Sequence, residues 1–240
     1  MKTVNIFQYN ISNPPFEFNN NKCLINTLNA YSFVIAEQNK EFKKALQSSD
    51  ILLPDGFPIV KAVKLLRKEK VLKIAGADIH KYLLESANNK NQKVFYLGSS
   101  NKTLQKIRER INNEYPSIKF SSFSPPYKQK FSDEDNKLMI EAVNAVNPDV
   151  LFIGMTAPKQ EMWASLHKKE LNVNIICCIG AVFDFYAGTV RRAPDRLIKF
   201  KLEWFYRLVK EPKRMWKRYL IYSPKFYWYL FLAVIGLKKY

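Results

Sequence analysis

The chain lacks the motifs of several common enzyme classes. It contains no G-x-S-x-G, no P-loop lysine motif and no G-x-G-x-x-G, so hydrolase, nucleotide triphosphatase and dehydrogenase functions lose support. Its two histidines, His80 and His167, fall on predicted helices without partner spacing, and the sequence has no His/Cys cluster of the kind that binds zinc. We interpret both histidines as core or surface residues, and we expect no metal or other cofactor.

A secretory leader and a long apolar segment are also lacking. The N-terminal residues contain no apolar signal-peptide core. Cys23, Cys177 and Cys178 lack C-x-x-C spacing, which predicts buried, reduced thiols in the cytosol. The last apolar run, residues 226–237, has twelve residues, whereas a bilayer-spanning helix needs about twenty. We therefore expect an active domain on the cytoplasmic face of the membrane, with this run lying in the membrane interface as a peripheral, monotopic anchor.

Acidic residues are few, and the excess positive charge is uneven. The chain has 39 Lys and Arg against 21 Asp and Glu, a formal net charge of +18. Residues 196–240 hold twelve of the Lys and Arg, two Glu and thirteen of the 34 aromatic residues. Such a tail predicts an anionic partner, either a membrane or nucleic acid. Because lipid would bury the terminal apolar run and nucleic acid would not, we favour the inner leaflet of the cell membrane. A nucleic-acid-binding protein is the alternative.

Short apolar runs alternate with amphipathic helices over most of the chain. The runs expected to form strands are residues 4–9, 32–36, 51–53, 71–75, 94–97, 150–153 and 175–179. This alternation predicts an α/β fold, a Rossmann-like and mostly parallel sheet with helices on both faces, over residues 1–195. Residues 196–240 show helical patterns only and predict a helical membrane-docking appendage. The appendage would have to be covered when no membrane is present, which suggests a homo-oligomer.

An Asp-x-Asp sequence, the usual metal ligand of nucleotide-sugar enzymes, occurs at Asp133 and Asp135. It starts a predicted helix instead of ending a strand. We therefore interpret Ser132 as the helix N-cap and the acids as its first turn.

Glycines follow two of the predicted buried strands, Gly154 after residues 150–153 and Gly180 after residues 175–179. Beyond the first of them, Pro158 can occupy the first turn of a helix. Helix starts that face the carboxyl ends of parallel strands bind anions and nucleotides. This half of the chain is therefore expected to hold a phosphate-bearing ligand.

Asp55 follows an apolar strand and precedes Gly56, so its carboxylate is expected at the carboxyl edge of the sheet. Sugar transfer by direct displacement needs a base that takes the proton of the attacking hydroxyl, and Asp55 could be that base. The alternative is a plain Asp-Gly turn.

Gly98 and Ser99, after another strand, could cradle uridine or phosphate, although one glycine is a weak signal.

The chain resembles the WecG/TagA/CpsF family, glycosyltransferase family 26. Four motifs agree in order and spacing: Gly154-x-x-x-Pro158-Lys159-Gln160-Glu161, Phe183-Asp184-x-x-Ala187-Gly188, Arg192-Ala193-Pro194 and Glu203-Trp204-x-x-Arg207. Leu53-Pro54-Asp55-Gly56 and Gly76-Ala77-Asp78-Ile79 also resemble it, so the likeness covers roughly residues 34–219. The resemblance implies an inverting, metal-independent glycosyltransferase that acts in bacterial surface-polysaccharide or teichoic-acid assembly. N-acetylmannosamine, its uronic acid or glucose would pass from a UDP-sugar to a polyprenyl-diphosphate-linked saccharide.

The resemblance also implies roles for individual residues. Asp55 would be the base, Gln160 and Asn39 would position the sugar, and Lys159 would support the departing diphosphate. Glu37 stands where members commonly carry a Thr that lines the pocket. This leaves the donor sugar open and keeps a non-catalytic UDP-binding relative as a further alternative.

Two further residues of the matched motifs have open roles. Asp184, next to Phe183, either contacts the ligand or braces a loop, and Glu161 either contacts the ligand or is structural. Further residues are taken as substrate-binding: Gly56, Gly154, Pro158, Gly180, Phe183 and Arg192.

Three arginines of the tail are expected to hold the lipid diphosphate acceptor. Arg207, Arg214 and Arg218 are spaced by seven and four residues, which places them near one face of a continuous helix. Pro212 makes that continuity conditional, and a solvated basic face is the alternative.

Overall fold

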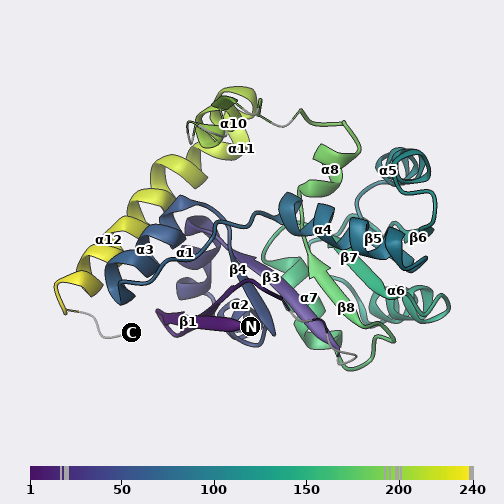
Figure 1. Ribbon diagram of the computed structural model, residues 1–240, viewed down its shortest axis with the longest axis horizontal. Helices are drawn as coiled ribbons and strands as arrows, with labels where there is room; N and C mark the ends of the chain where they lie inside the picture. Colours follow the sequence, from purple (N-terminus) through teal and green to yellow (C-terminus); the bar gives the residue numbers. More distant parts are fainter. Residues whose placement is uncertain are drawn as a thin grey trace.

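A computed structural model describes residues 1–16, 18, 22–191, 193–194, 196–197, 200 and 202–237. Within these residues one eight-stranded sheet has the order β1-β2-β4-β3-β8-β7-β5-β6 (Figure 1). Every neighbouring pair is parallel except β1 and β2, which form an antiparallel hairpin. The strands are β1 Lys2–Ile6, β2 Tyr9–Asn13, β3 Cys23–Leu28, β4 Ile51–Pro54, β5 Lys93–Gly98, β6 Lys119–Phe123, β7 Val150–Gly154 and β8 Ile175–Cys178.

Helices cover both faces of this sheet, so the predicted α/β class and mostly parallel arrangement are confirmed. The helices are α1 Ala30–Gln38, α2 Lys40–Gln47, α3 Phe57–Arg67, α4 Gly76–Asn89, α5 Asn101–Glu114, α6 Asp133–Asn144, α7 Lys159–His167 and α8 Val182–Tyr186. The C-terminal segment contains α10 Glu203–Lys210, α11 Pro212–Trp216, the π-helix η1 Lys217–Tyr222 and α12 Ser223–Val234. None of the helices in the described residues combines the length and apolarity that crossing a bilayer requires.

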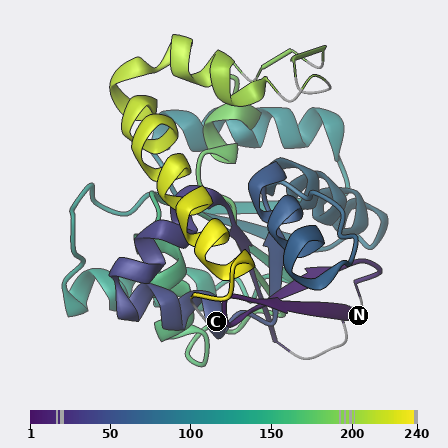
Figure 2. The ribbon, with the colours of Figure 1, turned by 90° about the vertical axis from the view of Figure 1, so that its left-hand side faces the viewer.

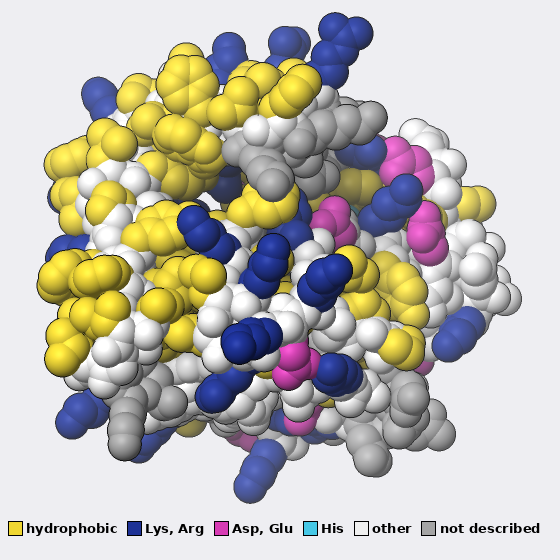
Figure 3. Space-filling model, turned by 60° about the vertical axis from the view of Figure 1, so that its left-hand side comes forward, with side chains coloured by type: hydrophobic (Ala, Val, Ile, Leu, Met, Phe, Trp, Pro, Cys, Tyr) yellow, Lys and Arg dark blue, Asp and Glu magenta, His cyan; other side chains and the backbone are white. Residues whose placement is uncertain are grey.

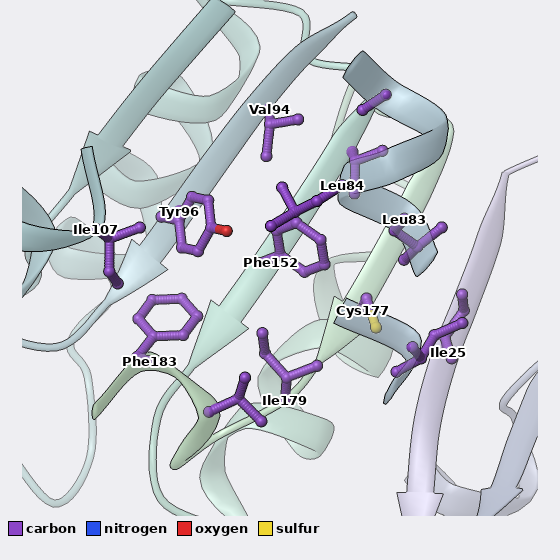
Figure 4. Packing of buried hydrophobic residues seen from close by; sticks show 14 of the residues in the cluster. Ile25, Leu83, Leu84, Val94, Tyr96, Ile107, Phe152, Cys177, Ile179 and Phe183 are labelled. Carbon is purple, nitrogen blue, oxygen red and sulfur yellow. The ribbon is translucent and has the colours of Figure 1, made fainter. Parts of the chain in front are cut away.

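The central strands are apolar on both faces because each face is covered. Cys177 packs in a cluster with α4, α5 and α8, whereas Cys178 packs in a second cluster with α6 and α7. In the first cluster Tyr96 lies beside Phe152 and Phe183, as Figure 4 shows. The hydroxyl of Tyr96 is 2.6 Å from Nε2 of His80, which is buried. His80 is thus a core histidine, one of the two alternatives that the sequence left open.

The last helix returns to the N-terminal half of the sheet. In Figures 1 and 2, α12 lies along α1 and α3. Phe226 of α12 is fully buried, with ring centroids 5.2 Å from that of Phe33 and 6.3 Å from that of Phe7. Leu230 belongs to the same apolar cluster. The helical C-terminal region is therefore present as predicted, and its last helix contributes to the core.

Three sequence-based strand assignments were wrong. Residues 32–36 belong to α1, because Asn29 and Ser32 form a capping box that starts a helix there. The strand that precedes α1 is β3, which the sequence analysis did not predict. Residues 71–75 form no strand, although Ile74 N donates to Pro54 O at 3.1 Å. The single strand predicted over residues 4–9 is instead a hairpin that turns at Phe7 and Gln8.

The interpretation of the Asp-x-Asp sequence as a helix start is confirmed. Ser132 is the N-cap of α6, where its side chain accepts from the Asp135 backbone N–H at 3.2 Å. The Asp135 carboxylate accepts in return from the Ser132 N–H at 2.9 Å. Among the residues that the structure describes, no group of three or more His, Cys, Asp or Glu is placed to hold a metal ion.

Candidate active site at the carboxyl edge of the sheet

A cavity of about 920 Å³ runs along the carboxyl ends of the parallel strands. Sheet order places β3 next to β8, so that the strands β1 to β4 lie on one side of this junction and the strands β5 to β8 on the other. A crevice forms at such a switch point, and ligands of open α/β sheets bind there. The cavity wall includes residues at or after the ends of five strands: Thr27 of β3, Asp55 after β4, Gly98 of β5, Gly154 of β7 and Gly180 after β8. The C-terminal segment closes the opposite side.

Asp55 is fixed at this edge by the neighbouring strand. Its backbone N–H donates to Leu28 O at 2.9 Å, and its Oδ2 accepts from Asn29 Nδ2 at 3.3 Å. Burial raises the pKa of the Asp55 carboxyl, while Arg218, the Asn29 hydrogen bond and Lys73 act in the opposite direction. A carboxylate with a raised pKa is a stronger base at neutral pH.

Arg218 reaches the cavity from η1. Its guanidinium lies 4.9 Å over the Tyr31 ring, and the Tyr222 ring meets Tyr31 edge-on at 5.1 Å. Burial lowers the pKa of Arg218, whereas the charge of Asp55 opposes that effect. The C-terminal segment thus brings a cation beside the candidate base.

The other two tail arginines also line the cavity, although the helix is not continuous. Arg207 lies on α10, with its guanidinium 5.3 Å over the Phe185 ring. Arg214 lies on α11 and is 2.5 Å from Glu211. The two short helices and η1 together direct all three arginines to the same cavity, and their role in acceptor binding remains a prediction.

Gln160 and Glu161 form the wall at the start of α7. Gln160 is 4 % exposed, and its Oε1 accepts from the Met155 backbone N–H at 3.2 Å. Its Nε2 donates to Glu161 Oε1 at 2.8 Å. Burial raises the pKa of Glu161 to about 7, against the opposing effects of the Gln160 hydrogen bond and the Arg218 charge.

Lys159 lines the cavity but already has partners. Its Nζ donates to Lys128 O at 2.7 Å and lies 4.3 Å over the Phe131 ring. Burial lowers its pKa. The lysine therefore holds the loop between β6 and α6 against the cavity, and two of its three N–H groups remain for a ligand.

The glycines allow backbone strands to approach closely. Gly98 has φ +124°, and a Cβ there would lie 2.4 Å from Gly154 O. A Cβ on Gly154 would lie 2.5 Å from the Phe183 ring, which is 1 % exposed. Phe183 thus packs the floor of the cavity. Ser99, with φ +60°, accepts through its carbonyl from Ser124 Oγ at 2.7 Å.

Asp184 lines the cavity on α8 and also braces the chain beyond it. Its carboxylate Oδ1 is 3.3 Å from Thr189 Oγ1, and its carbonyl accepts from the Thr189 N–H at 3.0 Å. Both interpretations offered by the sequence are thus compatible with its position.

Four predicted site residues lie away from the cavity wall. Asn39 caps α2 by accepting from Phe42 N at 3.0 Å, and Glu37 binds Lys43 Nζ at 2.9 Å. Gly56 and Pro158 are the N-cap residues of α3 and α7 and do not line the cavity either. The side chain of Asn39 is engaged in this helix cap, and its contact with the sugar stays a prediction. Arg192 lies outside the described residues.

Sequence reasoning missed Thr27, Asn29 and Tyr31, which all line the cavity. They follow or end β3, the strand that was not predicted. The signal was the sequence Thr27-Leu28-Asn29 directly after an apolar run, at the same kind of strand end as Asp55. Thr27 thus lines the cavity and Glu37 does not, while the effect of Glu37 on the choice of donor sugar stays a prediction.

Comparison with known proteins gives consistent matches. The Glycosyl transferase WecG/TagA/CpsF family model matches residues 16–240. The N-acetylglucosaminyldiphosphoundecaprenol N-acetyl-beta-D-mannosaminyltransferase of Bacillus subtilis (strain 168) is 33% identical over 203 residues, which cover 85% of this chain and 77% of the relative. Its namesake in Bacillus spizizenii is 32% identical over 191 residues, 80% of this chain and 72% of the relative. The Staphylococcus aureus (strain MW2) namesake is 26% identical over 195 residues, 81% and 75% of the two chains.

The family match spans most of the chain, and three of the four motifs that suggested it contribute residues to one cavity wall. The resemblance inferred from those motifs is thus confirmed, and with it the enzyme class. The chain belongs to the WecG/TagA/CpsF family of glycosyl transferases.

Proposed function

We propose that the protein transfers N-acetylmannosamine from a UDP-sugar to N-acetylglucosaminyl-diphosphate-polyprenol, with inversion and without a metal ion. The relatives carry this donor sugar and acceptor in their names. The single observation that carries the proposal is the position of Asp55 in the cavity wall, where its carboxylate accepts from the amide of Asn29 and the charge of Arg218 lowers its pKa. That arrangement supplies a base beside a cation that can bind an anionic acceptor.

In this reaction Asp55 takes the proton of the acceptor hydroxyl while its oxygen attacks the anomeric carbon. The bond from that carbon to the UDP oxygen breaks, and UDP leaves from the opposite face. Two features of the wall suit the diphosphate: the Lys159 ammonium and the first turn of α5, whose N-cap is Ser100. Arg207, Arg214 and Arg218 suit the acceptor diphosphate, because guanidinium groups bind phosphate oxygens bidentately.

Membrane association follows from the chemistry of a polyprenyl acceptor, and one face of the structure suits it. On α12, Trp228 is 59% exposed and Phe231 is 52% exposed, although Phe226 on the opposite side of the helix is buried. Figure 3 shows hydrophobic side chains gathered over this side of the molecule with Lys and Arg beside them. Lys61 of α3 lies 5.7 Å over the Tyr227 ring, so the basic face of α3 borders the apolar face. We propose that this face lies on the inner leaflet of the cell membrane.

The reaction is tested with the intact protein, a short-chain N-acetylglucosaminyl-diphosphate lipid and a panel of UDP-sugars, in the presence of EDTA. We expect transfer from UDP-N-acetylmannosamine. Transfer only from UDP-glucose or from the uronic acid donor would contradict N-acetylmannosamine as the transferred sugar and identify the sugar that is used. Transfer that requires added divalent metal would contradict metal independence. UDP binding without transfer from any donor would support a non-catalytic relative.

The membrane surface is tested by exchanging both Trp228 and Phe231 for Ser, which leaves the buried side of α12 unchanged. We expect binding to anionic vesicles to fall at least tenfold, because two interfacial aromatic side chains are lost. The matched control exchanges the exposed Leu138 and Leu166, on α6 and α7, for Ser and should bind as the unaltered protein does. Equal binding by both double variants would contradict the proposed face.

A further inference from the structure

Glu161 is a buried carboxyl group with one oxygen to spare. Its side chain lines the cavity, and the residue is 3 % exposed. Oε1 accepts the hydrogen bond from Gln160, whereas Oε2 is buried and has no hydrogen-bond partner among the described residues. Buried polar atoms in folded proteins are almost always paired, and leaving one unpaired costs free energy. A bound ligand would supply the missing partner.

The orientation of Glu161 is set by the hydrogen bonds around it. Because Gln160 Oε1 accepts from the Met155 N–H, Gln160 Nε2 must be the group that faces Glu161. The Gln160 amide is in turn confined by the chain at Gly180, where a Cβ would lie 3.4 Å from Nε2. Oε1 is therefore occupied in a fixed way, and Oε2 is the atom left for a ligand.

The charged and titratable groups near Glu161 do not satisfy this atom. Arg218 is close enough to lower the pKa of Glu161 but makes no hydrogen bond to Oε2, and its guanidinium is held over the Tyr31 ring. The hydroxyl of Tyr31 and the thiol of Cys178 also lie within electrostatic range. The Cys178 Sγ donates elsewhere, to Gln160 O at 3.7 Å.

The position of Glu161 along the cavity indicates which part of a substrate it meets. Sheet order runs from β4, which Asp55 follows, through β3, β8 and β7 to β5, which Ser99 follows. Glu161 follows β7 and therefore lies between the candidate base and the α5 end of the cavity. A transferred sugar occupies the same interval, because its anomeric carbon must lie beside the base while its diphosphate extends away.

We propose that Glu161 is a specificity-determining residue of the donor site, whose Oε2 accepts a hydrogen bond from the transferred sugar. The inference rests on the UDP-sugar donor of the proposed function. The sugar group is an acetamido N–H or a hydroxyl, since both donate to a carboxylate. Glu161 binds and selects the sugar and takes no part in the proton transfer assigned to Asp55.

Glu161→Gln tests this with little change of shape. Its amide oxygen can still accept from Gln160 Nε2, and its NH₂ group then replaces the accepting Oε2 with a donor. We measure dissociation constants for UDP and for UDP-N-acetylmannosamine by calorimetry on the full chain. We expect UDP to bind within twofold of the unaltered protein and UDP-N-acetylmannosamine to bind about 10- to 100-fold more weakly, the usual effect of losing a charged hydrogen bond.

UDP-mannose carries a hydroxyl in place of the acetamido group. It therefore distinguishes a sugar hydroxyl from the acetamido N–H as the group that donates to Glu161. An equal loss with UDP-mannose identifies a hydroxyl as the partner. If the unaltered protein binds UDP-mannose weakly and Glu161→Gln binds it no more weakly, the partner is the acetamido N–H. Either result supports the inference.

The control is Glu141→Gln, an exposed carboxylate on α6 that lies 3.9 Å from Lys137. It should bind both ligands as the unaltered protein does. Two results would overturn the inference: unchanged binding of UDP-N-acetylmannosamine by Glu161→Gln, or equal loss of UDP and UDP-sugar binding. These binding measurements need no acceptor. Failure of sugar transfer to the lipid acceptor would therefore contradict the proposed reaction without contradicting this inference.

Discussion

Replacing Glu161 by Gln should stabilise the fold at alkaline pH while it impairs sugar binding. Burial raises the Glu161 pKa from 4.5 to about 7. The folded protein therefore holds a proton on Glu161 between these pH values, whereas the unfolded chain has lost it. The difference of about 2.5 between the pKa values corresponds to about 3 kcal/mol, at 1.36 kcal/mol per pKa unit. Ionised Glu161 thus destabilises the folded state by up to that amount.

Because the Glu161 pKa is higher in the folded than in the unfolded state, the free energy of unfolding falls as pH rises. Below pH 4.5 the group is protonated in both states and contributes no penalty. The penalty grows as pH rises from 4.5 to about 7 and is complete above that range. Gln resembles the protonated carboxyl at every pH. We therefore expect Glu161→Gln to match the unaltered protein at about pH 4.5 and to exceed its unfolding free energy by up to about 3 kcal/mol at pH 8.

Urea unfolding without ligand, followed by fluorescence at several pH values, measures this difference. The control is again Glu141→Gln, which should show no comparable gain between pH 4.5 and pH 8. A Glu161→Gln protein that is no more stable than the unaltered one at pH 8 would refute the reasoning. It would mean that Glu161 is well solvated or fully paired in the folded state.

Two further predictions concern packing and charge. Gly154→Ala should lower the unfolding free energy by about 1–3 kcal/mol or more, because its Cβ would overlap the Phe183 ring. An unchanged melting temperature would contradict that close contact. Arg218→Met should shift the acidic limb of the pH–rate profile to higher pH, since Arg218 lowers the Asp55 pKa, whereas Arg218→Lys should shift it less. A pH–rate profile that is the same in Arg218→Met and the unaltered protein would contradict the effect of Arg218 on the Asp55 pKa.

The strands that sequence analysis located correctly are those with continuous apolar runs. Residues 51–53, 94–97, 150–153 and 175–179 lie within or overlap β4, β5, β7 and β8, which helices cover on both faces. In contrast, β3 carries Asn26 and Thr27 in its second half. Asn26 is fully buried and donates from Nδ2 to Ser49 Oγ at 2.9 Å. A buried polar residue whose amide nitrogen is paired with a residue 23 positions later concealed the strand.

The same physics explains why α1 was taken for a strand. Its residues Phe33, Val34 and Ile35 are apolar all round, since α12 covers the side that would otherwise face solvent. The return of α12, more than 180 residues later in the sequence, cannot be read from local periodicity. For the same reason, the placement of Arg218 beside Asp55 required the three-dimensional structure.

The direct test of the central claim is sugar transfer by Asp55→Asn beside the unaltered protein. Both are assayed with UDP-N-acetylmannosamine and the short-chain N-acetylglucosaminyl-diphosphate lipid, and donor binding is measured separately. Asp133→Asn, an exposed acid on α6, is the control and should transfer normally. We predict that Asp55→Asn lowers the turnover rate about 10²- to 10⁴-fold, as expected for loss of a general base, and changes donor affinity by no more than a few fold. Transfer by Asp55→Asn at the unaltered rate would contradict the assignment of Asp55 as the base.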